Sequence, residues 1–239
     1  MKLKEGIIVK AIKYQDNSKI ITLITENGKE SIILKGATNL KGHTFRYSHE
    51  LTKIGYEIQK NYLSAGKVLN QYPSIHNNID KLQSSLKIIE IADVLTEHIN
   101  DFKTFYIFLD DIIKLIDQEE SYLIFEIIFR IKTLYLLGVA PIFTRCVECG
   151  TKNDLVNFSL YSGGMKCKKC HQNDFLFSKK TINYLKLLYL TKLDDFVKRK
   201  DEFQDFDYDE ANKFLNMYYD YYLGYKSKVE NVFKKMKKM

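Results

Sequence analysis

Four cysteines stand in two Cys-x-x-Cys pairs, Cys146 with Cys149 and Cys167 with Cys170, and the 239-residue chain has no others. A tight turn at each pair would direct both sulfurs to one side, and two facing turns would supply the four sulfurs that Zn²⁺ favours, at about 2.3 Å from the ion. The seventeen residues between the pairs fall within the range typical of zinc sites. We therefore expect one structural zinc ion and, with thiolate at every position, no open position for a substrate.

Other roles for these cysteines fit the surrounding sequence less well. A thioredoxin-like redox pair would lie in a βαβ pattern, which neither pair has. His171 adjoins Cys170 and could bind the metal only by displacing that cysteine. A zinc ion with four thiolates carries a charge of −2, which we expect the nearby lysines to offset; the alternative is that they contact a polyanion. These lysines are Lys166, Lys168, Lys169, Lys179 and Lys180.

The first 74 residues predict a small β domain ahead of this segment. Five β-branched or aromatic runs are expected to form strands, at 6–14, 18–25, 29–35, 49–59 and 66–72, with a turn at "NYLSAG" before the last. Asn27-Gly28 is typical of the tight turn of a hairpin. Five short strands in about 70 residues favour a closed barrel of the oligonucleotide-binding (OB) type, interrupted by a loop at 35–48.

From residue 75 onward the pattern changes to that of helices. Apolar residues recur at steps of three and four from Ile79 to Ile99, and further helices are expected at 102–116, 121–137, about 179–192 with Ser178 as its N-cap, and 208–235. The sequence thus predicts a mixed α+β fold. Residues 1–74 would form the OB-type barrel and 75–239 a helical domain, with a zinc ribbon inserted at about 144–178.

The charge is distributed unevenly along the chain. The formal net charge is +7. Residues 1–60 carry eleven Lys or Arg against six Asp or Glu, residues 76–130 carry five against eleven, and residues 226–239 carry six against one. The basic ends favour a polyanionic partner, although solvated lysines without any partner would give the same balance.

The sequence shows no stretch of about 18 to 20 apolar residues that would span a membrane. Glu5 and Gly6 interrupt what would be the apolar part of a signal peptide. We expect a soluble protein of the cytoplasm, where metal binding by paired cysteines is more common than disulfide formation.

Three segments together resemble the RecO family of bacterial recombination-repair proteins. They are "YQDNSKIITLITENGKESIILKGA" at 14–37, "FEIIFRIKTLYLLGVAPIFTRCVECG" at 125–150 and "FSLYSGGMKCKKC" at 158–170. They follow the order of the family and reach to about 70% of the 239 residues. The resemblance implies an OB-fold, a helical body and a zinc ribbon.

The resemblance also implies a function and partners. It implies binding to single- and double-stranded DNA, annealing of complementary strands, and action with RecR to help RecA displace single-strand-binding protein (SSB), whose acidic C-terminal tail would be a ligand. The tyrosine-rich segment from residue 218 onward would suit such a tail, or its tyrosines form core. Family members commonly carry several arginines after the "KGA" turn, whereas this chain has only Lys41 and Arg46.

An OB barrel binds single strands by stacking bases on aromatic rings while lysines contact phosphates. Our candidate DNA-binding residues are Lys13, Tyr14, Lys19, Lys35, Lys41, Arg46 and Tyr47. Ordinary packing within the barrel is the alternative for each aromatic residue. The sequence has no nucleophile elbow, phosphate-binding glycine loop or cluster of histidine with carboxylate, so we predict no enzymatic activity.

Two other classes of protein share these features. An RNA-binding or ribosome-associated module with an OB barrel and a zinc ribbon would differ in preferring ligands with 2′-hydroxyl groups. A protein adaptor would use the barrel for protein contacts and would bind oligonucleotides poorly even at low salt.

Overall fold

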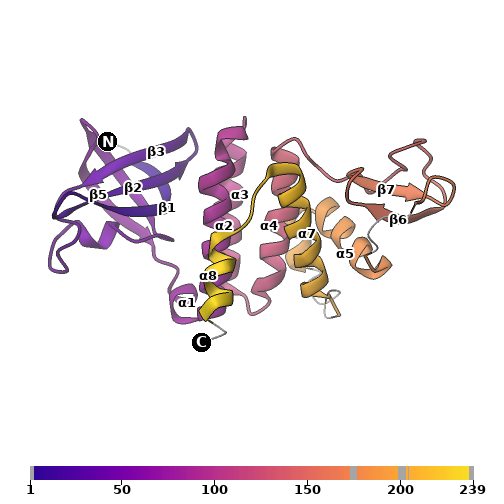
Figure 1. The fold of residues 1–239 in the computed structure, drawn as a ribbon. Helices are drawn as coiled ribbons and strands as arrows, with labels where there is room; N and C mark the ends of the chain where they lie inside the picture. The colour runs from indigo at the N-terminus through magenta and orange to yellow at the C-terminus, as the bar shows by residue number, and fades with distance from the viewer. Residues whose placement is uncertain (1–2, 173–176, 199–202, 204, 237–239) are drawn as a thin grey trace. The chain divides into compact units, whose positions relative to one another are not determined.

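The computed structural model describes residues 3–172, 177–198, 203 and 205–236 (Figure 1). The chain divides into two compact units, Met1–Glu126 with Ser227–Met239, and Ile127–Lys226. The boundary between them falls within one helix, α4.

Five strands form a closed barrel in the first unit, in the order β1-β2-β3-β5-β4. The strands are β1 (Lys4–Tyr14), β2 (Ser18–Thr25), β3 (Gly28–Leu34), β4 (Lys53–Gln59) and β5 (Tyr62–Asn70). Neighbouring strands are antiparallel except β3 and β5, which close the barrel through the pairing of Ile33 with Tyr62. The predicted OB-type barrel is confirmed.

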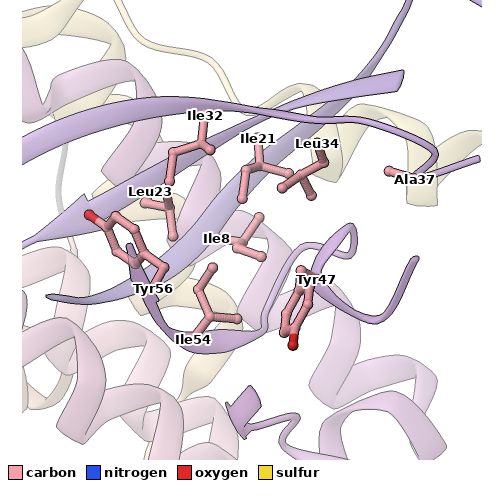
Figure 2. Close-up of a cluster of buried hydrophobic side chains, with 9 residues drawn as sticks. All are labelled: Ile8, Ile21, Leu23, Ile32, Leu34, Ala37, Tyr47, Ile54 and Tyr56. Atoms are coloured by element: carbon pink, nitrogen blue, oxygen red, sulfur yellow. The ribbon is translucent and has the colours of Figure 1, made fainter. Parts of the chain in front are cut away.

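Alternation of side chains along the strands builds the core of the barrel. Figure 2 shows nine buried residues that converge inside it, among them Ile21 and Leu23 from β2 and Ile32 and Leu34 from β3. Each fully buried aliphatic side chain contributes about 1.5 to 3 kcal/mol relative to exposure. Tyr47 closes one end of the core from the short 3-10 helix η1 (Phe45–Tyr47) and donates a hydrogen bond of 2.6 Å to the carbonyl oxygen of Gly66.

The last two strands differ from the prediction. The segment "NYLSAG", expected to be a turn, belongs mostly to β5, because Lys60 and Asn61 alone make the reversal. Both have positive φ, 49° and 66°. A two-residue turn with two left-handed residues matches the twist of a hairpin, so β5 begins at Tyr62. β4 begins at Lys53 rather than at residue 49.

Helices complete the first unit and follow the predicted periodicity closely. They are α1 (Pro73–Asn77), α2 (Ile79–Leu95), the 3-10 helix η2 (Thr96–His98), α3 (Phe102–Gln118), the start of α4 (Tyr122–Leu136) and α8 (Lys228–Met236). Side-chain caps set two of the starts: Asn78 accepts from the backbone N–H groups of Asp80 and Lys81, and Asp101 accepts from that of Thr104.

The described residues of the second unit form the rest of α4, a two-stranded ribbon and three more α-helices. These elements are β6 (Leu155–Ser159), β7 (Gly164–Cys167), α5 (Lys179–Leu190), α6 (Leu193–Lys198) and α7 (Tyr208–Leu223). Ser178 is the N-cap of α5, as predicted, and accepts a hydrogen bond of 3.1 Å from the Thr181 N–H.

The predicted single helix over 208–235 is wrong. The helix α7 ends at Leu223 and is capped by Gly224, whose φ of 60° is left-handed, and the chain becomes helical again only at Lys228. Glycine adopts this conformation at low cost and is the usual residue after a helix end.

The end of the barrel agrees with the predicted boundary at residue 74, since β5 ends at Asn70 and α1 begins at Pro73. However, the helices α2 and α3 contact the barrel and belong to the same compact unit. A functional boundary at residue 74, and a ribbon insertion at 144–178, therefore stay predictions.

Within the described part of the chain, no helix is long and apolar enough to cross a membrane.

Candidate metal centre and nucleic-acid interface

The four cysteine sulfurs gather in one place in the second unit. The Sγ atoms of Cys146, Cys149, Cys167 and Cys170 all lie within 4.8 Å of one another. The Sγ atoms of Cys149 and Cys167 are 3.7 Å apart. A tetrahedron with about 2.3 Å from centre to corner has edges of about 3.8 Å, so the Cys149–Cys167 distance matches one edge of a four-thiolate zinc site, and the four sulfurs lie close enough together to hold one metal ion.

Backbone turns hold each pair of cysteines in place. Gly150, with φ of 75°, donates from its N–H to the carbonyl oxygen of Cys146 at 2.9 Å. The Cys170 N–H donates to the carbonyl oxygen of Cys167 at 3.0 Å. Each turn thereby folds back on its first cysteine and brings the second sulfur to the same side.

The same turns adjust the acidity of the thiols. The backbone N–H of Cys149 lowers the pKa of Cys146 to about 6. The backbone N–H of Cys170 lowers the pKa of Cys167, whereas the pKa of Cys170 is raised to about 12 because its thiol shares hydrogen bonds with the sulfurs of Cys167 and Cys149. A divalent cation at the centre would replace those shared protons and stabilise all four thiolates.

The two cysteine turns are joined by the ribbon. Ile142, ahead of the first turn, pairs with Gly164 at the start of β7, and the Val147 N–H donates to the carbonyl oxygen of Met165 at 2.9 Å. A Cβ on Gly164 would lie only 2.7 Å from the carbonyl oxygen of Ile142. The close approach of the two segments thus requires glycine at this position.

The histidine and the lysines next to the cysteines in sequence are not among the grouped metal-binding side chains. Over the described residues, the four cysteines form the only group of three or more potential metal ligands, and His171 is exposed outside it. Lys166 is buried, with its Nζ 3.4 Å from Oε1 of Glu148. Lys168, Lys169, Lys179 and Lys180 are exposed.

The predicted DNA-binding residues gather around the β1–β2 turn and the loop at 35–48. Lys13 and Lys19 are direct cross-strand partners in β1 and β2. The Nζ of Lys19 donates to the carbonyl and the hydroxyl oxygen of Ser48, both at 3.2 Å, and Thr38 hydrogen bonds to Asn17 in the β1–β2 turn. The loop therefore packs against this end of the barrel.

Cations project from this end next to aromatic rings. The Nζ of Lys35 lies 4.2 Å from the centre of the Tyr62 ring. The guanidinium of Arg46 lies 4.9 Å from the Tyr47 ring and hydrogen bonds to Nε2 of His43 at 2.6 Å. Lys13, Lys35, Lys41 and Arg46 are all exposed, and no carboxylate of the described residues pairs with them.

The aromatic candidates are divided by burial. Tyr14 is half-buried at the end of β1. Tyr47 has 0% exposure and packs inside the barrel, so its ring cannot receive a base in this fold, and this candidate needs correction. Tyr62, which was predicted to lie in a turn, begins β5 and is 37% exposed beside Lys35. The position of Tyr62 depends on its pairing with Ile33. The sequence gives no sign of this pairing, because β3 and β5 are parallel and are not consecutive strands.

Many other cations of the barrel are neutralised by carboxylates. Lys4 pairs with Glu30 at 3.0 Å, and Asp93 of α2 pairs with Lys29 at 2.6 Å. Lys53 lies 2.7 Å from Asp110; burial lowers its pKa, but the hydrogen bond and charge of Asp110 outweigh burial and raise it overall. Among the described residues up to 60, the exposed cations that pair with no carboxylate are therefore those near the β1–β2 turn and the loop at 35–48, together with Lys60 in the β4–β5 turn.

The barrel, the helices and the clustered cysteines define a class of protein, an OB-fold protein with a helical body and a four-cysteine ribbon. Family comparison agrees: residues 1–72 match the family model "Recombination protein O N terminal" and residues 76–229 match "Recombination protein O C terminal". The chain belongs to the recombination protein O (RecO) family, which confirms the resemblance.

Three curated relatives illustrate the similarity, and each is named "DNA repair protein RecO". The protein from an Exiguobacterium species is 27% identical over 225 residues, which cover 91% of this chain and 88% of the relative. That from Listeria monocytogenes is 26% identical over 244 residues, 98% of this chain and 94% of the relative. That from Clostridium perfringens is 31% identical over 198 residues, 79% of this chain and 80% of the relative.

Proposed function

We propose that the protein is a DNA repair protein that binds single- and double-stranded DNA through its barrel and anneals complementary strands. The observation that carries this proposal is the group of exposed cations that pair with no carboxylate in the part of the chain that the structure describes, Lys13, Lys35, Lys41 and Arg46, on an OB-type barrel in a chain of the RecO family. Such cations attract phosphates without regard to sequence, and the charge polarity of the barrel orients the strand toward this end.

Annealing of this kind needs no catalytic group. Cations that neutralise two phosphate backbones remove the repulsion between complementary strands, and weak contacts let the strands search for their register. We therefore expect the protein to act by binding alone, as a recombination mediator rather than as an enzyme.

The four cysteines would hold one Zn²⁺ ion, with Cys146, Cys149, Cys167 and Cys170 as its ligands. The ion would supply structural cross-linking, since four thiolates leave no open coordination position. The size of the sulfur cluster and the acidified thiols of Cys146 and Cys167 support this assignment. The ribbon would thus be braced against the segment before the first cysteine turn.

The proposed partners follow from the family. The protein would act with RecR, bind the C-terminal tail of SSB and, through these contacts, help RecA load onto SSB-coated single strands. We propose a cytoplasmic location near the nucleoid. The barrel at 1–74 would contact DNA, while the helical domain at 75–239 would carry the ribbon.

Titration of fluorescent single-stranded DNA at several salt concentrations tests the proposal. We expect affinity to fall steeply with salt, and the slope to decrease by about one for each phosphate contact removed. The test variant replaces Lys35, Lys41 and Arg46 with Ala. The matched control replaces three exposed lysines elsewhere, Lys103, Lys192 and Lys198, and so has the same net charge.

Two outcomes would point to other functions. A weak response that does not depend on salt would favour a protein adaptor. Tighter binding of a matched RNA oligomer than of DNA would favour an RNA-binding module, because only RNA offers 2′-hydroxyl groups.

A further inference from the structure

A polar cleft lies at one end of the barrel, wholly within the first unit. Its volume is about 350 Å³, near the lower limit of the roughly 300 to 1,000 Å³ that is typical of ligand sites. Its walls come from the start of β1, the β2–β3 turn, the start of β3, the middle of β4 and the first half of α3. Five segments that are distant in sequence therefore meet around one small space.

The walls of this cleft are acidic. Three carboxylates line it, those of Glu5, Glu26 and Glu30. Lys4 also lines it and pairs with Glu30 at 3.0 Å, while Lys53 pairs with Glu5 at 3.3 Å. Glu26 is exposed in the β2–β3 turn and has no ion-pair partner in the described part of the chain. The cleft therefore retains negative charge in a chain whose net charge is +7.

The Glu30 carboxylate is held in place before any ligand binds. The Tyr56 hydroxyl points away from the other side chains of the barrel core (Figure 2) and donates a hydrogen bond of 2.9 Å to Oε2 of Glu30. The Lys4 ammonium donates to both Glu30 oxygens, at 3.0 and 3.3 Å. A carboxylate fixed in this way loses little side-chain freedom when it accepts a further hydrogen bond.

A second tyrosine of the cleft, Tyr106 of α3, has an unsatisfied polar group. Its side chain is 8% exposed, and its buried hydroxyl has no hydrogen-bond partner among the described residues. The Lys53 ammonium lies 5.6 Å from the centre of the Tyr106 ring but donates to Asp110 at 2.7 Å. Buried polar groups are nearly always hydrogen bonded. An unpaired hydroxyl in the wall of a cleft therefore indicates a position where a ligand would bond.

The position and the charge of the cleft narrow the class of ligand. The β2–β3 turn lies at the opposite end of β2 from the β1–β2 turn, where the proposed DNA-binding cations gather. Carboxylates repel phosphates, so nucleic acid does not fit here. A metal ion does not fit either, because over the described residues the cysteines alone form a group of three or more potential metal ligands. The ligand that remains is an organic cation.

We propose that this cleft binds an arginine side chain of a protein partner, with the carboxylate of Glu26 and the hydroxyl of Tyr106 as acceptors for its guanidinium. A guanidinium carries five N–H donors in a flat fork, so it can bond to a carboxylate and a hydroxyl together, whereas a lysine offers a single point charge. The site would bind protein at one end of the barrel while the other end is open to DNA. It thus goes beyond the proposed function and does not depend on it.

Short peptides test the proposal on the full chain. The peptide acetyl-Gly-Arg-Gly-amide is titrated into isotope-labelled protein, and the backbone amide signal of Asn27, which lines the cleft, reports binding by nuclear magnetic resonance. The comparison peptide has citrulline in place of arginine, because citrulline has nearly the same shape but no charge.

Three variants accompany the titration. Tyr106→Phe removes the unpaired hydroxyl, and Glu26→Gln removes the unpaired carboxylate. The matched control is Glu97→Gln on η2, since Glu97 is also exposed and the change of charge is the same. Thermal melting verifies that each variant folds.

We expect the Asn27 signal to shift saturably with the arginine peptide and not with the citrulline peptide. Tyr106→Phe should weaken binding about fivefold and Glu26→Gln about threefold, the losses expected for one hydrogen bond and for one exposed charge pair. Tyr106→Phe should melt no lower than wild type, because the hydroxyl makes no hydrogen bond to the described residues that could be lost. Glu97→Gln should bind as wild type does.

Three results would overturn the proposal. They are the absence of a saturable shift with the arginine peptide, equal shifts with both peptides, and unchanged affinity in both cleft variants. The titration contains no DNA, so each of these results would leave the proposed function intact. Failure of the wild-type protein to bind DNA would overturn the proposed function and leave the arginine site standing.

Discussion

Lys87 and Glu126 form a buried ion pair, with the Lys87 Nζ 2.7 Å from Glu126 Oε1 and side-chain exposures of 3% and 1%. Glu126 also accepts a hydrogen bond of 2.8 Å from the Ser84 hydroxyl, and Glu230 of α8 lies 3.8 Å from Lys87. The pair thus connects α2, α4 and the C-terminal helix α8. Two charges can be buried here because each has a close partner of opposite sign.

Loss of one member of this pair should be costly. Lys87→Met leaves Glu126 buried without its cation, and we expect the free energy of unfolding to fall by about 3 to 5 kcal/mol. Urea denaturation followed by circular dichroism measures the change. The double variant Lys87→Met with Glu126→Leu removes both charges and should be clearly more stable than the single variant. Equal stabilities would contradict a dominant cost from the unpaired charge.

Asp110 should make stability depend on acid pH. Burial raises the pKa of Asp110, but hydrogen bonds from Lys114 and Lys53 outweigh burial and hold the pKa below its usual value. A lowered folded-state pKa stabilises the protein above the unfolded pKa of about 3.9, and this contribution is lost as pH falls through the folded pKa. Urea unfolding between pH 3 and 7 should therefore show a decline below about pH 4 that is smaller in Asp110→Asn. An identical decline in the variant would assign it to other carboxylates.

The metal centre gives a third prediction. Elemental analysis of protein purified without added metal should find close to one zinc per chain. Cys149→Ser removes one thiolate and should lower the zinc content and loosen the second unit, because metal binding contributes directly to folding in such sites. Glu148→Gln, in the same turn, is the control and should retain zinc, since the Glu148 side chain is half exposed and pairs with Lys166 rather than with a cysteine. Full zinc content in Cys149→Ser would exclude the four-cysteine site.

Local patterns in the sequence predicted most of the elements. Runs of β-branched residues predicted the strands around Ile21 and Ile32, and Ser178 was the expected N-cap at the start of α5. The cysteine spacing predicted the cluster, because each Cys-x-x-Cys turn is determined by its own few residues. The interruption at Gly224 was missed because apolar residues with helical spacing continue on both sides of it.

The residues that were misjudged depend on contacts between distant segments. Tyr47 follows Arg46 in a loop that was expected to be exposed. Its ring is buried because the loop folds back onto the barrel core, and the sequence alone does not show this. Tyr62 gained its position from pairing with Ile33, a contact between strands that are not neighbours in sequence.

Lys13 and Lys19 should oppose each other in the free protein and cooperate in binding. They are cross-strand partners in β1 and β2, and like charges in this arrangement destabilise a sheet by about 0.2 to 1 kcal/mol. Lys13→Met should therefore increase the free energy of unfolding slightly while it weakens DNA binding and reduces the salt slope by about one. Lys13→Arg keeps the charge and should preserve the salt slope. Greater stability together with undiminished DNA binding in Lys13→Met would show that the DNA strand does not pass this pair of lysines.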